Sequence, residues 1–283
     1  MKRKNSIDIY TSNNQGIISR FHLIVTMLLS FILFFSSCRN EQTLRTIIVN
    51  LNTVDDIKAL DSLTIIPYEY RHIVSLKDLS VIEKKQKFIE LLLPSILIAK
   101  QNIAFKQDKF IHLMKQDSSK LGNHDKIFLR GLIKKYKAKS FTDLKSKLNT
   151  HPTSIVLAQS AIESGWGSSR FFIEANNIFG VWSYNKSDER IKASQSRDGK
   201  DIYLKKYTSI SESIEDYFLI IARGPYKELR KLREVNNDPY EIIKELYRYS
   251  ETGEEYVSKL EVIIKKNKLT QFDNYTIDSE YLD

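Results

Sequence analysis

One glutamate, Glu163, has surroundings that would let a carboxylic acid keep its proton near neutral pH. A mostly apolar run from Ile155 leads up to it and Gly165 ends that run, which predicts a helix with Glu163 in its last turn. The negative end of a helix and apolar neighbours both disfavour a charged carboxylate, and Trp166 could add an aromatic wall. Glu163 is therefore a candidate general acid, although a solvated glutamate at a helix end explains the same residues.

The elements that must position this acid are mainly helices. Apolar residues recur at helical spacing from Val81 to Met114, with Pro94 inside the run as a kink or a first helical turn. A hydroxyl of Thr153 or Ser154 is expected to cap the central helix. Further helices are expected over residues 123–136, around 141–148, after Ser209, after Asp238-Pro239 and over about 254–264.

Residues 178–207 interrupt the helical pattern with a small β segment. Residues 178–182 and 202–207 are strand candidates, and Asp198-Gly199 between them has the composition of a tight hairpin turn. Thr46–Leu51 is a separate strand candidate. The chain as a whole is therefore expected to be α+β and mostly helical.

The N-terminal residues carry the marks of export. Basic residues precede a short apolar run, Phe21–Phe35, which is followed by Ser36-Ser37-Cys38. This junction resembles the lipobox of bacterial lipoproteins, in which the cysteine is lipidated, although Phe35 stands where leucine is usual. A plain signal peptide with an incidental Cys38 is the alternative. The expected location is the bacterial cell envelope, and Arg39 after the cysteine favours a lipid anchor in the outer membrane, facing the periplasm.

The composition limits the kinds of molecule that the protein is expected to bind. The chain is 42% hydrophobic and 28% charged, as ordinary globular domains are, and its net charge is +9. A basic surface would favour acidic cell-wall peptides or lipid head groups, unless the lysines simply solvate the helices. Nucleic acid is not an expected partner of an exported protein. The five histidines lack metal-ligand spacing, so neither a metal nor a cofactor is expected.

The central motif resembles a known enzyme family. Leu157–Phe171 followed by Asn176–Trp182 closely resembles the glucosaminidase domain of glycoside hydrolase family 73, nearest its Bax-type branch. Phe88–Pro94, Tyr207–Tyr217 and Tyr249–Leu260 are similar to flanking segments of that branch, so the resemblance covers roughly residues 84–268. It implies a lysozyme-like glucosaminidase fold with a small β-hairpin lobe and an N-terminal helical extension. It also implies cleavage after N-acetylglucosamine in peptidoglycan glycan strands.

The resemblance completes the expected domain organisation. We expect a lipoprotein signal peptide over 1–37, a poorly defined tether over 38–80, and a helical extension over 81–150. The glucosaminidase domain is expected over 151–268, and a flexible tail over 269–283. The oligomeric state is not indicated.

Residues of the site follow from the same resemblance. Glu163 falls on the family's proton donor, and Tyr249 on a tyrosine that lines its cleft or, alternatively, is a buried structural residue. Gln159, one helical turn before the acid, is expected to orient it or to contact the sugar. Asn177 is expected to bind glycan or, more simply, to cap a turn, and Trp182 to stack on a sugar or join the core. Three other aromatic residues, Tyr256, Trp166 and Phe179, are expected to be structural.

The second carboxylate is where the chain departs from the family. Family members with two acids carry a glutamate in the hairpin. Gln195 occupies that place here and is expected to bind substrate, with Asp188 and Glu189 as nearby alternatives for the acid. The substrate's acetamido group could then act as nucleophile, or water could be held by neutral groups such as Tyr249. The predicted function is an endo-β-N-acetylglucosaminidase; a catalytically weak or inactive glycan-binding lipoprotein is the alternative.

Overall fold

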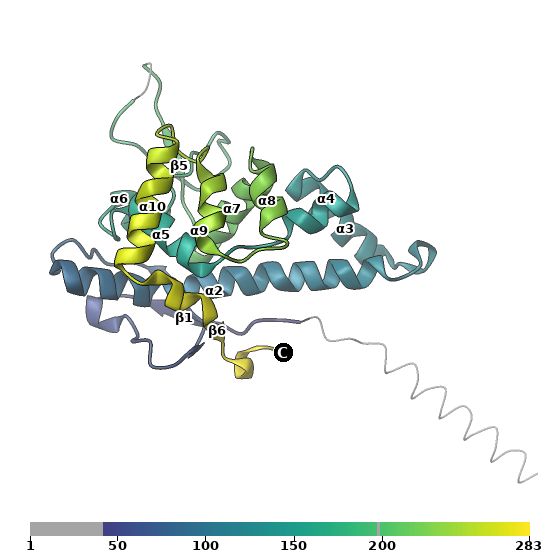
Figure 1. The fold of residues 1–283 in the computed structure, drawn as a ribbon, viewed down its shortest axis with the longest axis horizontal. Coiled ribbons are helices and arrows are strands. Elements are labelled where there is room, and N and C mark those ends of the chain that lie inside the picture. Colours follow the sequence, from purple (N-terminus) through teal and green to yellow (C-terminus); the bar gives the residue numbers. More distant parts are fainter. Residues whose placement is uncertain (1–41, 197–198) are drawn as a thin grey trace, which may run out of the picture. The chain divides into compact units, whose positions relative to one another are not determined.

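A long helix, α2 (Val81–Met114), is the element on which several of the other described helices pack (Figure 1). The computed structural model describes residues 42–196 and 199–283. The predicted signal peptide, Cys38 and the Asp198 turn residue lie outside these residues. Ser80 caps α2 by accepting a hydrogen bond from the backbone N–H of Glu83. The helix continues through Pro94, so this proline does not mark a first turn.

The apolar character of α2 reflects burial in the protein. Its most apolar 18-residue window has a mean hydropathy of 1.4, long and apolar enough to cross a membrane, but 67% of that window is buried. Residues Phe88–Ala99 are buried almost without interruption. A lipid-exposed helix would not be enclosed in this way, so α2 is the core helix of the domain.

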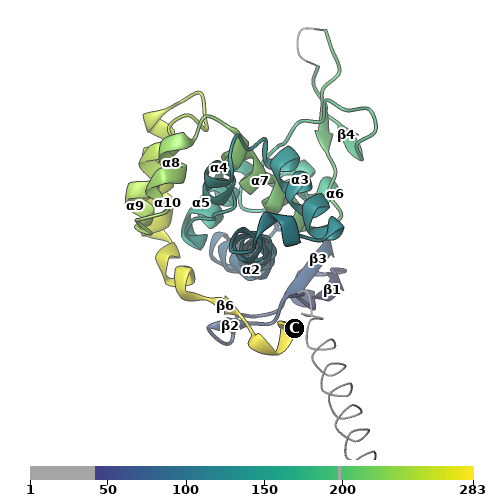
Figure 2. The same ribbon diagram turned by 90° about the vertical axis from the view of Figure 1, so that its right-hand side faces the viewer.

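Two hydrophobic clusters surround α2. The larger joins it to α5 (Thr153–Ser164), α7 (Ile210–Arg223) and α10 (Glu254–Lys266) through residues such as Leu91, Ala158, Ile214 and Leu260. The smaller lies at the end of α2 and involves α3 (Asn123–Tyr136) and α4 (Phe141–Lys147). Figure 2 looks along α2 and shows these helices gathered on one side of it. The shorter helices are α6 (Arg170–Ala175), α8 (Lys227–Leu232) and α9 (Pro239–Ile242).

The strands form three short pairs. β1 (Ile47–Asn50) is parallel to β3 (Tyr68–His72), and β2 (Thr64–Ile65) is parallel to β6 (Thr276–Ile277). β4 (Arg190–Lys192) and β5 (Tyr203–Lys205) are antiparallel, with Ile191 opposite Leu204, and form the predicted hairpin lobe. The expected strand over 178–182 is instead a loop, because Gly180 is left-handed (φ 61°) and only Trp182 pairs, in an isolated bridge with Leu204.

Five short 3₁₀ helices complete the described chain. They span Val54–Asp56, Ser118–Lys120, Ile243–Leu246, Leu269–Asn274 and Ser279–Tyr281.

The expected tether and the expected flexible tail are both ordered in the described residues, so these two expectations are corrected. Leu51, Tyr70 and Leu76 are fully buried in the main core, and so is Leu269. The two segments also bind each other, because the backbone of Thr43 exchanges two hydrogen bonds with Asp283, at 3.2 and 3.0 Å. Strand pairs between residues more than 200 positions apart leave little local periodicity in a sequence, which explains the wrong expectation.

The C-terminal segment also fixes the helix that carries Glu163. The predicted hydroxyl cap of α5 is wrong: Pro152 is the N-cap residue and has no side-chain cap. Instead, Asp273 accepts hydrogen bonds from the backbone N–H of Ser154 at 2.7 Å and from its hydroxyl at 2.8 Å. Lys100 donates to the Thr153 hydroxyl at 3.0 Å, and burial lowers the pKa of Lys100 to about 8. A carboxylate from a distant segment therefore caps α5.

We expect Asp273→Ala to lower the free energy of unfolding by about 1–2 kcal/mol, because it leaves a helix N-terminus without its acceptor. Urea unfolding followed by circular dichroism measures this change. Asp278→Ala is the matched control, since Asp278 accepts only from Glu280 N–H at the start of a three-residue 3₁₀ helix. Equal losses in the two variants would contradict the role assigned to Asp273.

Candidate active site

Glu163 is the penultimate residue of α5, and a tight left-handed turn follows it. Gly165, Trp166 and Gly167 have φ values of 58°, 57° and 79°. The Ser164 hydroxyl holds the turn by donating to Ser160 C=O at 2.6 Å and accepting from Gly167 N–H at 3.1 Å. A side chain at position 167 would meet Leu76 at 2.9 Å, so this position requires glycine. The sequence Ser-Gly-Trp-Gly is thus needed to end α5 sharply beside the acid.

The aromatic residue that contacts the acid is Tyr256, which the sequence analysis took as structural. Its hydroxyl donates a hydrogen bond to Glu163 Oε1 at 2.9 Å, and the tyrosine is 3% exposed. Trp166, the expected wall, packs edge-on against Phe88 at 5.4 Å, with the Lys85 ammonium 5.0 Å from its ring. The left-handed turn explains this difference, because it directs the chain away from α5 immediately after Glu163.

Burial raises the pKa of Glu163, and the hydrogen bond from Tyr256 offsets part of that rise. Burial also raises the pKa of Tyr256, Tyr249 and Tyr217 well above the ordinary value, so all three phenols are protonated at neutral pH. The carboxyl group therefore lies half-buried beside neutral hydrogen-bond donors. This environment suits a group that must hold a proton and then release it.

Tyr249, which was expected to line the cleft or to be structural, lies beside Tyr256. The two rings stack with centroids 5.5 Å apart and an interplanar angle of 21°. Tyr249 also meets the edge of Tyr217, at 6.2 Å. It lies between the 3₁₀ turn at Ile243–Leu246 and α10, and is only partly buried.

Gln159 is fully buried, so the expected sugar contact is wrong. Its amide donates to the Tyr256 hydroxyl at 3.2 Å and accepts a hydrogen bond from the Tyr217 hydroxyl. Gln159 thus acts on the acid through Tyr256, which agrees with the expected orienting role rather than with substrate contact.

Residues 138–269 match the family model Glucosaminidase, described as mannosyl-glycoprotein endo-beta-N-acetylglucosaminidase. The chain carries a glucosaminidase domain. The matched segment ends one residue after the predicted boundary and begins within the predicted helical extension.

Two curated proteins are similar to the chain. Protein Bax of Escherichia coli K12 is 26% identical over 204 residues, which are 65% of this chain and 70% of Bax. The exo-glucosaminidase LytG of Bacillus subtilis is 27% identical over 136 residues, 42% of this chain and 45% of LytG, so the chain spans less than half of LytG. Among solved structures, the catalytic domain of the autolysin Auto from Listeria monocytogenes is 26% identical. That similarity covers 59% of this chain and 97% of Auto's domain, with a TM-score of 0.38.

Asn177 and Trp182 have different roles in the glucosaminidase domain. Asn177 is 1% exposed, and its amide group makes three hydrogen bonds, two with Val181 and one with Lys205 C=O. It therefore caps the loop, and the alternative of glycan contact is wrong. Trp182 is 38% exposed at the base of the hairpin lobe, next to the exposed Tyr184 at 6.0 Å. Of the two, only Trp182 is free to stack on a sugar.

The hairpin lobe contains Gln195, Asp188 and Glu189, the residues considered at the place of a second catalytic acid. Gln195 is exposed in the connection between β4 and β5. Asp188 accepts from the Ser183 hydroxyl at 3.0 Å. Asp188 and Glu189 line a polar pocket of about 620 Å³ with Lys205 and other residues of α7 and β5, and Glu163 is not among its lining residues. The two candidate second acids thus share a pocket with each other and not with Glu163.

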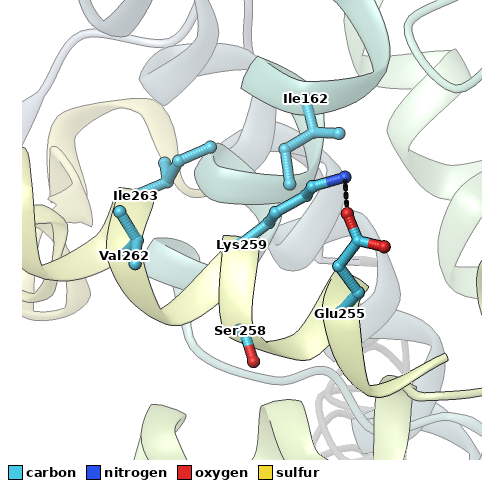
Figure 3. A pocket seen from close by; sticks show the side chains of 6 residues that line it. All are labelled: Ile162, Glu255, Ser258, Lys259, Val262 and Ile263. Atoms are coloured by element: carbon cyan, nitrogen blue, oxygen red, sulfur yellow. Dashed lines mark ion pairs between the residues drawn. The ribbon is translucent and has the colours of Figure 1, made fainter. Parts of the chain in front are cut away.

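A smaller hollow lies on the outer side of the helix pair that supplies Glu163 and Tyr256 (Figure 3). Its volume is about 320 Å³. Lys259 of α10 reaches toward Ile162 of α5 and forms an ion pair with Glu255 at 2.7 Å. Among residues 42–196 and 199–283, no group of three histidine, cysteine, aspartate or glutamate side chains is placed to hold a metal.

We expect Glu163→Gln to unfold at higher urea concentration than the wild type at pH 7. The folded state raises the pKa of Glu163, so ionisation above the unfolded-state pKa costs stability, and a neutral glutamine avoids that cost. The difference should shrink toward pH 4, where the wild type keeps the proton. Glu174→Gln, which alters an exposed partner of Arg170, is the control. The assignment would be refuted if the stability of Glu163→Gln, measured relative to the wild type, were lower at pH 7 than at pH 4.

Proposed function

We propose that the chain is a peptidoglycan hydrolase, an endo-β-N-acetylglucosaminidase that cleaves glycan strands after N-acetylglucosamine. The observation that carries the proposal is Glu163, a half-buried carboxyl with a raised pKa, hydrogen-bonded to Tyr256 inside the segment that matches the glucosaminidase family. The resemblance of the central motif supports peptidoglycan as substrate. A net charge of +9 would favour an acidic polymer.

Glu163 is the proton donor in the proposed reaction. Its proton moves to the glycosidic oxygen as the bond to the anomeric carbon breaks, and the Tyr256 hydroxyl stabilises the carboxylate that remains. On the opposite face, the substrate's own acetamido oxygen attacks the anomeric carbon, and water then opens the resulting oxazolinium ion and returns a proton to Glu163. In the alternative route, a water near Tyr249 attacks the anomeric carbon and releases its proton to solvent, and Glu163 regains a proton from solvent. A second carboxylate is not required by this sequence of steps.

We expect Glu163→Gln to reduce the release of soluble fragments from purified peptidoglycan by at least 100-fold, because an amide cannot donate the proton. Mass analysis of the wild-type fragments should show new reducing-end N-acetylglucosamine within the strands. Glu174→Gln, a surface glutamate change, should leave release unchanged.

Other outcomes separate the alternatives. Full activity in Glu163→Gln would disprove the proposal. Release of single sugars from strand ends would favour an exo activity, the activity named for LytG. Wild-type protein that sediments with peptidoglycan but releases nothing would favour the glycan-binding lipoprotein, which the neutral Gln195 first raised.

We further propose that Cys38 is lipidated and anchors the domain in the outer membrane, facing the periplasm. The apolar run before Ser36-Ser37-Cys38, the single cysteine and Arg39 at the next position support this.

Metabolic labelling with an alkyne fatty acid in a bacterial host should label the wild type and not Cys38→Ser. Fractionation should move the protein from the membrane to the soluble fraction in that variant. Lys77→Ala, a change within the ordered domain, is the control, and this variant should be labelled like the wild type. Equal labelling of Cys38→Ser would rule out this anchor.

A further inference from the structure

A chain of four hydrogen bonds, the first three of them buried, leads from His151 to Glu163. His151 Nε2 lies 2.8 Å from the Tyr217 hydroxyl, and Tyr217 is hydrogen-bonded to Gln159 Oε1. Gln159 Nε2 lies 3.2 Å from the Tyr256 hydroxyl, which lies 2.9 Å from Glu163 Oε1. The residues come from the segment before α5, from α7, from α5 itself and from α10. The first four are at most 3% exposed.

All four hydrogen bonds run in the same direction, with the donor on the side of His151 and the acceptor on the side of Glu163. A phenol has one hydrogen, so when Tyr256 donates to Glu163, its oxygen must accept from the Gln159 amide. Gln159 then offers its carbonyl oxygen to the Tyr217 hydroxyl. Tyr217 must in turn accept from a hydrogen on His151 Nε2. Every donor thus points toward Glu163.

His151 is suited to be the first donor. Burial, the Arg233 guanidinium and the Lys100 ammonium all lower the pKa of His151, so the imidazole is neutral and has a single ring hydrogen. Arg233 is itself 3% exposed and donates to Ser146 C=O at 3.2 Å. The direction of the chain assigns that hydrogen to Nε2. Phe179 stacks on Tyr217 at 4.4 Å and fixes the tyrosine ring, whose hydroxyl links His151 to Gln159.

We propose that His151, Tyr217 and Gln159 are positioning residues that orient the Tyr256 hydroxyl toward Glu163 and stabilise the carboxylate formed when Glu163 gives up its proton. The inference deepens the proposed function and rests on it for the role of Glu163. Hydrogen bonds shielded from water polarise one another, so the effect of a distant donor reaches the acid through the ones between. A misplaced member would leave a buried polar group without its partner, which is costly.

The direct test is the titration of the Glu163 carboxyl by ¹³C NMR, with the resonance assigned from Glu163→Gln. The phenols that face this carboxyl are Tyr256, Tyr249 and Tyr217. Tyr256→Phe should move the midpoint to higher pH by about one unit, because the carboxylate loses a donor. Tyr217→Phe should move it in the same direction by less.

Tyr226→Phe is the matched control. Tyr226 is a buried tyrosine of the same aromatic cluster, 6.4 Å from Tyr249, and is not a member of the chain. It should leave the midpoint unchanged. A midpoint unchanged in Tyr256→Phe, or moved equally in Tyr217→Phe and Tyr226→Phe, would overturn the inference.

A second measurement needs no substitution. ¹⁵N NMR of His151 at neutral pH should show a neutral ring with its hydrogen on Nε2, and a hydrogen on Nδ1 would overturn the proposed direction. The activity readout is the basic limb of kcat/KM on soluble glycan strands, which should move to higher pH in Tyr256→Phe. Undiminished activity of Glu163→Gln would disprove the proposed function. The titration of the Glu163 carboxyl would still test the chain of hydrogen bonds.

Discussion

The hydrogen bond between Tyr256 and Glu163 is the interaction on which the site depends. It joins two residues 93 positions apart, at the point where α5 and α10 pack against each other. Burial raises the pKa of Glu163, whereas full solvation would leave the carboxyl ionised near neutral pH. The Tyr256 hydroxyl offsets part of the effect of burial on the pKa of Glu163 and adds no charge. The surrounding structure can be understood as the means of keeping this pair half-buried and aligned.

Alignment requires that α5 be fixed at both ends. Its C-terminus is ended by three left-handed residues, of which Gly167 has no space for a side chain. Its N-terminus is capped by Asp273, a residue of the 3₁₀ helix that follows α10. The C-terminal segment is in turn held by β2 and by the backbone of Thr43. Segments that resemble a tether and a tail by sequence therefore help to set the position of the acid.

Local sequence patterns predicted much of this. Helical periodicity located α2 and α10, Gly165 was expected to end α5, and Asp238-Pro239 was expected to begin a helix, which it does by accepting from Tyr240 N–H. What the patterns missed was non-local. Tyr256 has ordinary core spacing, and only tertiary packing places its hydroxyl on Glu163. The same holds for the capping of α5, because a hydroxyl at the helix start is the local solution, and a carboxylate about 120 residues away replaced it.

The shift in the pKa of Glu163 has two causes in the described part of the chain, burial and the Tyr256 hydrogen bond, and neither is a neighbouring charge. An acid perturbed mainly by burial responds to its ligand, because a glycan laid over it removes further water and raises its pKa again. An acid perturbed by a second carboxylate would respond less, since that charge is present with or without substrate. The neutral surroundings of Glu163 therefore couple substrate binding to retention of the proton. The buried donors behind Tyr256 oppose that rise, and they do so most strongly once the proton has left and the carboxylate is formed.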